Sequence, residues 1–213
     1  GPFYLAADFD QIARPSQWNE HHVLGAGAAA LTLANLVPRN PVKRALDIGT
    51  GGGIQALYLQ DHCDTVVGTD TNRRALDFAR LNAALNRIDN LEWRAGSRFD
   101  PVATERFDLI VSNPPYVISP EHQYEFRDGR MEGDDFCRAL LQTIPEHLNP
   151  GGRAVVSINW YHRGEDDWAE RPLAWMRPHA DCNRWLIKFD TDDPIAYAQQ
   201  WLVLKKEYPG SKK

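Results

Sequence analysis

The sequence predicts an α/β fold in which a mostly parallel β-sheet carries helices on both faces. Short apolar runs that end in glycine, aspartate or asparagine alternate with segments of helical periodicity. The chain has 213 residues, of which 43% are hydrophobic, and this is enough to bury one sizeable core. No internal repeat or long linker divides it. We therefore expect one domain over residues 22–213, preceded by an arm, or the remnant of an upstream region, at residues 1–21.

The first half of the chain predicts a helix followed by a βαβ unit. Residues 21–37 are rich in alanine and leucine at helical spacing, and they end before Pro38. The apolar run at 44–49 ends in glycines and predicts a strand, as does the run at 65–70. Residues 53–62 lie between these two strands and have helical spacing.

The same alternation continues toward the carboxyl end. Residues 72–86 predict an amphipathic helix, and residues 134–148 predict another. Three further strands are expected at 91–96, 106–113 and 153–161, the last after the turn residues 149–152. Beyond residue 162 the pattern weakens. There we expect a strand at 183–190 and a helix at 193–202 that begins at a capping aspartate.

Composition excludes several classes of protein. The net charge of −5 and the isoelectric point near 5.8 argue against a surface that coats nucleic acid nonspecifically. Cys63, Cys137 and Cys182 are scattered, without the spacing of a disulfide framework or a zinc site, so we expect a reducing cytoplasm and no metal. No apolar run approaches the roughly 18 residues of a membrane span. The opening Gly1-Pro2 resembles a protease scar, so we expect a part of a longer protein.

A glycine-rich stretch, LDIGTGGG at 46–53, follows the first predicted strand. Glycines at the carboxyl end of a parallel strand let a ligand approach the backbone closely. The Lys-Ser/Thr ending of a phosphate-binding loop is missing, which disfavours ATP and GTP. Asp47 lies inside the strand, where its carboxylate would repel a dinucleotide pyrophosphate but would suit a ligand with cationic amino and sulfonium groups. S-adenosylmethionine is such a ligand, and Asp70, about 20 residues later, is placed to accept ribose hydroxyls.

A second motif, Asn113-Pro114-Pro115-Tyr116, ends the fourth predicted strand. Two prolines cannot continue a sheet, so they predict a rigid loop at its edge. The nitrogen of an amide or of an adenine amino group delocalises its lone pair and is a poor nucleophile. If the Asn113 side-chain oxygen and the Pro114 carbonyl each accept one N–H, that lone pair becomes available for transfer. The Tyr116 ring then offers a surface on which a flat acceptor stacks.

Together these motifs resemble the class I S-adenosylmethionine-dependent methyltransferases with an NPPY motif. Within them the chain is most similar to the methyltransferase small domain group, which includes HemK-type protein-glutamine enzymes and N6-adenine enzymes. The resemblance covers roughly residues 22–160, and residues 133–152 are similar to the HemK-type stretch. It implies a Rossmann-like, mostly parallel seven-stranded sheet. It also implies a set of cofactor contacts: Asp47, Gly49, Thr50, Gly51 and Gly53 at the methionine part, Asp70 at the ribose, Gly96 and Ser97 at the adenine, and Asn113.

Two departures from the family pattern concern cofactor affinity and specificity. The third strand ends in Ala95-Gly96-Ser97, where the family often has an acid that binds the adenine amino group. HemK-type enzymes also carry an N-terminal helical domain that docks the release factor, whereas about twenty residues precede the first predicted helix. The docking element is therefore expected to be absent or removed.

The leading hypothesis is methyl transfer to a glutamine side-chain amide of a release-factor-like protein, with S-adenosylhomocysteine as product. The catalytic residues would be Asn113, Pro114 and Tyr116. One alternative is N6-adenine methylation of RNA or DNA, because NPPY serves both acceptors. Another is a non-catalytic scaffold that binds S-adenosylmethionine, which the presence of Asn113 disfavours. A nicotinamide dehydrogenase is disfavoured by Asp47.

Overall fold

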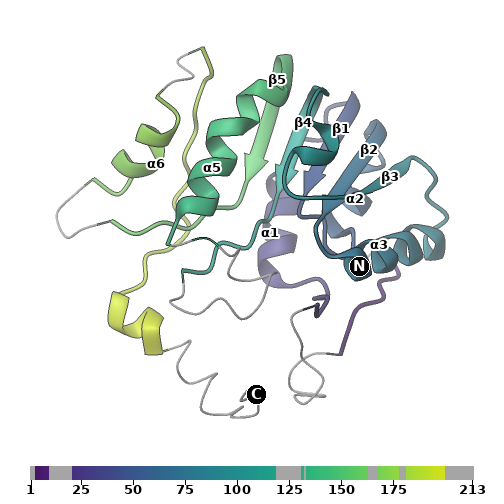
Figure 1. Cartoon of the computed structure of the whole chain (residues 1–213), viewed down its shortest axis with the longest axis horizontal. Coiled ribbons are helices and arrows are strands. Elements are labelled where there is room, and N and C mark those ends of the chain that lie inside the picture. The colour runs from purple at the N-terminus through teal and green to yellow at the C-terminus, as the bar shows by residue number, and fades with distance from the viewer. Residues whose placement is uncertain are drawn as a thin grey trace.

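The computed structural model describes residues 3–9, 21–118, 131, 133–162, 167–177 and 181–199. These residues contain a five-stranded parallel sheet of order β3-β2-β1-β4-β5 (Figure 1). Its strands are β1 (Val42–Ile48), β2 (Cys63–Asp70), β3 (Leu91–Ala95), β4 (Phe107–Ser112) and β5 (Leu148–Val156). Because all neighbouring strands run parallel, their carboxyl ends meet at one edge of the sheet.

Helices cover both faces of the sheet, as the alternation of elements predicted. The described helices are α1 (Ala28–Leu36), α2 (Ile54–Leu59), α3 (Arg73–Leu85), α5 (Asp135–Thr143) and α6 (Glu170–Trp175), with short 3-10 helices at Asp100–Val102 and Ile144–His147. Residues 194–199 are also helical. None of the helices in these ranges has the length and apolar character that crossing a membrane requires.

Two apolar clusters, one on each face, hold the layers together. Successive residues of a strand point to opposite faces, so Ala45 joins one cluster while Leu46 joins the other. The first cluster packs β1, β2 and β4 against α5 and α6 through Leu46, Ile48, Val67, Phe107, Ile110, Cys137, Leu140, Leu141, Ile144 and Trp175, among others. The second packs the opposite face against α1 and α2 through Leu33, Val37, Ala45, Ala56, Leu59, Cys63, Val66, Leu109 and Val111.

The expected α/β fold and all five strands up to residue 160 are confirmed, with shifted boundaries for β5. Its predicted start was residue 153, but Leu148 already pairs with Phe107, and the next registered pair is Leu109 with Arg153. The turn residues 149–152 therefore form an irregularity inside the strand, where Gly151 has a φ of 76°. The predicted end at residue 161 was also wrong. β5 stops at Val156 because Ser112, its partner, is the last residue of β4.

Three other sequence predictions need correction. The helix expected over 21–37 begins only at Ala28, because Gly25 and Gly27 disfavour a helix. In addition, the Val23 N–H donates to Asp8 Oδ2, and the Val23 carbonyl accepts the Asp8 N–H. The helix expected over 134–148 ends as an α-helix at Thr143, since Pro145 has no N–H to continue it.

The third correction concerns residues 183–190, which were predicted to form a strand. They are extended but join no ladder among the described residues, and Trp185 is 92% exposed. The alternating pattern indicates an extended chain, but a strand also needs a partner. The described part thus shows five of the seven expected strands. The helix predicted at 193–202 is present at 194–199, and its last three residues lie outside the described ranges.

Candidate active site

The residues predicted to bind the cofactor and the acceptor come together at the carboxyl edge of the sheet. Asp70 ends β2, Asp47 is the penultimate residue of β1, and Asn113 follows β4 directly. Gly96 follows β3, and its N–H donates to the carbonyl of Asp70 at 3.0 Å. Because β3, β2, β1 and β4 are neighbours in that order, four adjacent strand ends supply the site.

The loop after β1 is shaped by glycines with left-handed backbone conformations. Gly49, Gly51 and Gly53 have φ values of 67°, 55° and 86°. The N–H groups of Gly49 and Thr50 both donate to the carbonyl of Thr69, which ties the loop to β2. A Cβ on Gly49 or Gly51 would meet no atom of the described chain within 4 Å. These two glycines therefore present open backbone to an approaching ligand.

Gly53 has the opposite environment, and this contrast predicts different effects of two alanine substitutions. A Cβ on Gly53 would lie 3.0 Å from the Trp93 ring and 3.2 Å from the Ala79 Cβ. Gly53→Ala should therefore lower the free energy of unfolding by about 2 kcal/mol, and Gly51→Ala, which adds only backbone strain, by about 1 kcal/mol. Urea unfolding of the two variants measures both values. Equal destabilisation would contradict the packing role of Gly53.

Asp47 is a fully buried carboxyl group directly beneath this loop. Its Oδ2 accepts hydrogen bonds from the Thr50 hydroxyl at 2.6 Å and from the Ala56 N–H at 3.1 Å. Its Oδ1 is buried and has no hydrogen-bond partner among the described residues. Burial, with a smaller contribution from nearby Asp70, raises the pKa of Asp47 to about 7, although the hydrogen bonds from Thr50 and Ala56 lower it. A buried acceptor of this kind is stabilised by a cationic donor.

Asp70 is oriented by the backbone on both sides of its strand end. Its Oδ2 accepts the N–H of Gly51 and its Oδ1 accepts the N–H of Asn72, each at 2.8 Å. Asn72 in turn caps α3, because its side chain accepts from Arg74 N–H. The carboxylate is thus fixed at the boundary between the glycine loop and α3, half-buried. This is where an acid binds ribose hydroxyls in doubly wound folds.

The Asn113-Pro114-Pro115-Tyr116 loop is fixed at its base by β1 and β5. The Ser112 hydroxyl donates to the carbonyl of Ile48 at 2.8 Å, and the Ser112 carbonyl accepts from Ser157 N–H at 3.0 Å. Asn113 Oδ1 is buried and unpartnered within the described ranges, and Pro114 is buried. Because an unpaired buried acceptor is costly, Asn113 Oδ1 fits a ligand that donates an N–H.

Tyr116 packs against the apolar cluster of α5 and α6 and is half-buried. Burial, followed by Cys137 and Tyr197, raises the pKa of its phenol above the usual value. The phenol therefore stays neutral near neutral pH, and the expected role of its ring as a stacking surface remains a prediction.

Tyr197 belongs to the helical residues 194–199 and reaches this loop from far along the chain. Its hydroxyl oxygen accepts from the Ile118 N–H at 3.0 Å and from Asn159 Nδ2 at 3.4 Å. Asp193 caps the helix that carries Tyr197, by accepting from Ile195 N–H at 2.9 Å. Sequence reasoning predicted this helix but not its contact with the loop, because nothing in a local pattern indicates which distant loop a helix meets.

Gly96 and Ser97 were predicted to flank the adenine, and the structure places them beside Asp70. A Cβ on Gly96 would lie 2.5 Å from the Pro101 side chain, so glycine is required there for packing alone. Ser97 is exposed, and its carbonyl accepts from Asp100 N–H at 2.9 Å. Their contact with a cofactor remains a prediction.

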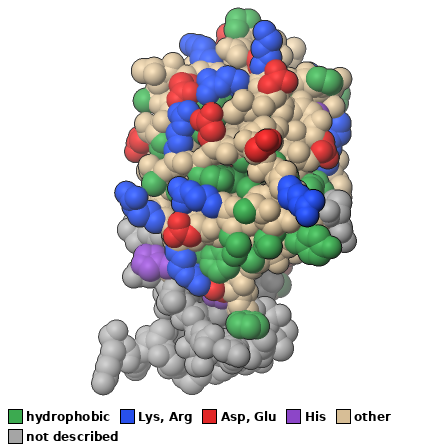
Figure 2. Space-filling view, turned by 90° about the vertical axis from the view of Figure 1, so that its right-hand side faces the viewer, with side chains coloured by type: hydrophobic (Ala, Val, Ile, Leu, Met, Phe, Trp, Pro, Cys, Tyr) green, Lys and Arg blue, Asp and Glu red, His purple; other side chains and the backbone are tan. Residues whose placement is uncertain are grey.

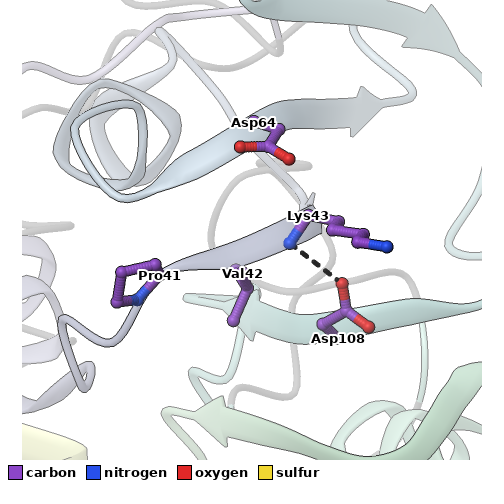
Figure 3. A pocket seen from close by; sticks show the side chains of 5 residues that line it. All are labelled: Pro41, Val42, Lys43, Asp64 and Asp108. Atoms are coloured by element: carbon purple, nitrogen blue, oxygen red, sulfur yellow. Dashed lines mark hydrogen bonds between the residues drawn. The ribbon is translucent and has the colours of Figure 1, made fainter.

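A hollow of about 430 Å³ lies at the opposite edge of the sheet, at the amino ends of β1, β2 and β4 (Figure 3). It is lined by Pro41, Val42, Lys43, Asp64 and Asp108, and Asp108 accepts from the Lys43 N–H at 3.1 Å. Its lining contains no residue of the described loops that follow the strands, so its size does not make it the candidate active site. The clustered acids, glycines and Asn113 locate that site at the carboxyl edge.

This fold and site define a class: a Rossmann-like α/β protein with a glycine loop after β1, an acid ending β2 and a rigid Asn-Pro-Pro-Tyr loop after β4. The chain belongs to the methyltransferase small domain family, whose model matches residues 21–167. A crystal structure of a methyltransferase from Pyrococcus furiosus superimposes with a TM-score of 0.50 and 25% identity, covering 68% of this chain and 73% of that one.

Two curated relatives are each similar to part of this chain. A release factor glutamine methyltransferase of Geobacter sulfurreducens is 40% identical over 128 residues, covering 53% of this chain and 44% of the relative. A ribosomal protein uL3 glutamine methyltransferase of Bradyrhizobium diazoefficiens is 34% identical over 149 residues, covering 63% and 47%. The chain spans about half the length of the curated relatives that it matches.

Proposed function

We propose that this protein transfers a methyl group from S-adenosylmethionine to the side-chain amide nitrogen of a glutamine in a protein, in the cytoplasm. The observation that carries the proposal is the Oδ1 of Asn113, which is buried and has no partner among the described residues, on the same edge as Asp47 and Asp70. Family membership and the glutamine methyltransferases among the relatives support it. S-adenosylhomocysteine would be the second product.

The residues present fit S-adenosylmethionine. Asp47 Oδ1 is a buried acceptor without a partner in the described chain, as an ammonium donor requires. Asp70 is suited to the ribose hydroxyls, and Gly49 and Gly51 leave space beside the backbone for the ligand. When bound, the cofactor supplies a methyl group that is already activated by the sulfonium.

The chain's own task is then to position the acceptor nitrogen and localise its lone pair. Asn113 Oδ1 and the Pro114 carbonyl would each accept one N–H of the amide, and Tyr116 would hold the flat group against its ring. No strong base is required, in agreement with the raised pKa of Tyr116. Positioning of this kind contributes about 7 kcal/mol or more to a rate enhancement.

The charge of the chain favours a protein acceptor over a nucleic acid. Asp and Glu outnumber Lys and Arg by 29 to 24. Figure 2 shows basic side chains interspersed with acidic ones on the face that it views, rather than a continuous basic stripe. N6-adenine methylation is the second candidate, because the Asn-Pro-Pro-Tyr geometry accepts N–H groups from either acceptor.

Methyl transfer from labelled S-adenosylmethionine tests the proposal. The acceptors to compare are a bacterial release factor, ribosomal protein uL3 and total RNA. We expect label in one of the two proteins and none in RNA. Label in RNA alone would establish the adenine alternative. Saturable cofactor binding without transfer to any acceptor would contradict the proposed enzyme and favour a scaffold.

Tyr197→Phe should lower the rate of transfer about tenfold while the dissociation constant for S-adenosylmethionine stays within about twofold, because Ile118 N–H loses its partner at the acceptor side of the site. Faster amide exchange at Ile118 is the accompanying structural signal. Tyr161→Phe is the matched control, since that hydroxyl accepts from the Arg171 side chain at 3.1 Å. Equal rates in wild type and Tyr197→Phe would exclude this role for Tyr197.

A further inference from the structure

The N-terminal residues 3–9 lie along α3 and are held there by two asparagines one turn apart. Asn86 pairs with Tyr4: the Tyr4 N–H donates to Asn86 Oδ1 at 2.9 Å, and Asn86 Nδ2 donates to the Tyr4 carbonyl at 2.7 Å. Asn82 pairs with Ala6 in the same way, at 2.7 and 3.0 Å. Positions i and i+4 share a helix face, and alternate residues share one edge of an extended chain, so the two spacings match.

A third attachment follows two residues later, at Asp8. Its N–H donates to the Val23 carbonyl at 3.0 Å, and its Oδ2 accepts the Val23 N–H at 2.9 Å. Asp8 also forms an ion pair with Arg74 of α3, and this hydrogen-bonded guanidinium lowers the pKa of the Asp8 carboxyl. Residues 3–9, which we call the N-terminal strap, are thus tied to α3 at every second residue.

Asn82 and Asn86 differ in their third hydrogen bond: Asn86 Nδ2 donates to the Asn82 carbonyl at 2.7 Å, whereas the third bond of Asn82 leads to the candidate active site. The Asn82 side chain is fully buried, and its Nδ2 also donates to the carbonyl of Gly52 at 2.8 Å. Gly52 lies between Gly51, whose N–H orients Asp70, and Gly53, which is the N-cap of α2. A single amide group therefore joins the strap, α3 and the glycine loop. Neither local periodicity nor the glycine motif indicates this role.

We propose that Asn82 is a positioning residue for the cofactor site: it holds the Gly51–Gly53 backbone in the conformation that binds the ligand, with the N-terminal strap fixing its own orientation. The identity of the ligand rests on the proposed function, but the effect of Asn82 on the loop does not. A buried amide that bonds the loop carbonyl on one side and the strap on the other has little freedom to rotate away, since it would leave both carbonyls unsatisfied.

Asn82→Ala and Asn86→Ala form a matched pair, because each removes two hydrogen bonds to the strap and one further bond. The further bond goes to Gly52 in the first case, and to the Asn82 carbonyl, away from the glycine loop, in the second. Amide exchange is measured without cofactor at Gly51 and Gly53, whose N–H groups are bonded to Asp70 and to the Thr50 carbonyl. We expect faster exchange at both glycines in Asn82→Ala alone, and faster exchange at Tyr4 in Asn86→Ala.

Titration calorimetry with S-adenosylmethionine is the second readout. We expect the dissociation constant to rise about tenfold in Asn82→Ala, and to stay within about twofold in Asn86→Ala. If Asn82→Ala gives no folded protein, Asn82→Ser is measured instead with the same expectation, because its hydroxyl is too short to reach Gly52. Equal effects of the two substitutions, or a lower melting temperature with unchanged glycine exchange and affinity, would overturn the proposal. A wild-type protein that does not bind the cofactor would instead refute the proposed function, and the exchange result would still decide the role of Asn82.

Discussion

Replacing Asn113 with alanine is expected to lower the rate of methyl transfer about a thousandfold, with a change of less than about threefold in the dissociation constant of S-adenosylmethionine. Asn113 Oδ1 is buried at the end of β4 and has no partner among the described residues, so under the proposed function it would accept an N–H of the acceptor. Removing it leaves the nitrogen lone pair delocalised, whereas the acids that serve the cofactor are unchanged. Single-turnover rates at saturating cofactor, together with calorimetry, measure the two quantities.

Asn149→Ala is the control for this substitution, because it removes an asparagine at the opposite edge of the sheet. Asn149 Nδ2 donates to Asp108 at 2.8 Å, beside the hollow of Figure 3. Its rate should equal that of the wild type. If Asn113→Ala retained transfer within about tenfold of the wild type, the acceptor nitrogen would have to be oriented by other groups.

Asp47→Asn is expected to weaken S-adenosylmethionine binding by about 2 kcal/mol, or roughly thirtyfold, because the ammonium loses a charged, buried partner. The raised pKa of Asp47 adds a pH dependence to wild-type binding. Below about pH 7 the carboxyl holds its proton, so affinity should fall about tenfold for each pH unit below that value. Calorimetry from pH 5.5 to pH 8 measures this trend, which Asp47→Asn should abolish.

The same carboxyl makes the cofactor-free protein less stable as pH rises. The unfolded chain releases the proton near 3.8, whereas the folded chain holds it up to about 7, so the native state binds more protons in this window. The free energy of unfolding of the wild type should fall between these pH values, by up to about 4 kcal/mol relative to the Asp47→Asn variant. Urea unfolding at pH 5 and pH 8 measures the free energy of unfolding of both proteins. An equal change in the two proteins between these pH values would show that the pKa of Asp47 is not raised.

Most of the fold was predictable because apolar periodicity and turn residues act locally. The apolar run that ends at Asp70 and the one that ends before Asn113 are strands, as predicted. The glycines after Ile48 form a loop, and several of them have positive φ values that glycine adopts readily. The start of α1 was mispredicted because of a tertiary contact, since Val23 pairs with Asp8 instead of starting the helix. The end of α5 was mispredicted for a local reason, because Pro145 lacks an N–H and a 3-10 helix follows Thr143. Residues 183–190 have the pattern of a strand but no partner in the described chain.

The candidate site was predictable to a similar degree. Its residues follow strand ends, and parallel strands bring their carboxyl ends to one edge, so Asp47, Asp70 and Asn113 could be placed together without coordinates. The contacts that other residues make with this site could not be predicted from the sequence. Asn82 is one asparagine on a helix face that otherwise reads as alanine-rich and apolar, and its bond to Gly52 depends on how α3 packs beside the loop. Tyr197 likewise reaches Ile118 across 79 residues of sequence.

Two acids at opposite ends of β2 allow a direct test of the proposed cofactor site, by titration calorimetry with S-adenosylmethionine. Asp70 ends the strand at the glycine loop, and Asp64 lies near its beginning, beside the hollow at the other edge. We expect saturable binding of one equivalent by the wild type, at least tenfold weaker binding by Asp70→Asn, and wild-type affinity for Asp64→Asn. Absence of binding by the wild type, or equal effects of the two substitutions, would contradict a cofactor site at the carboxyl edge of the sheet.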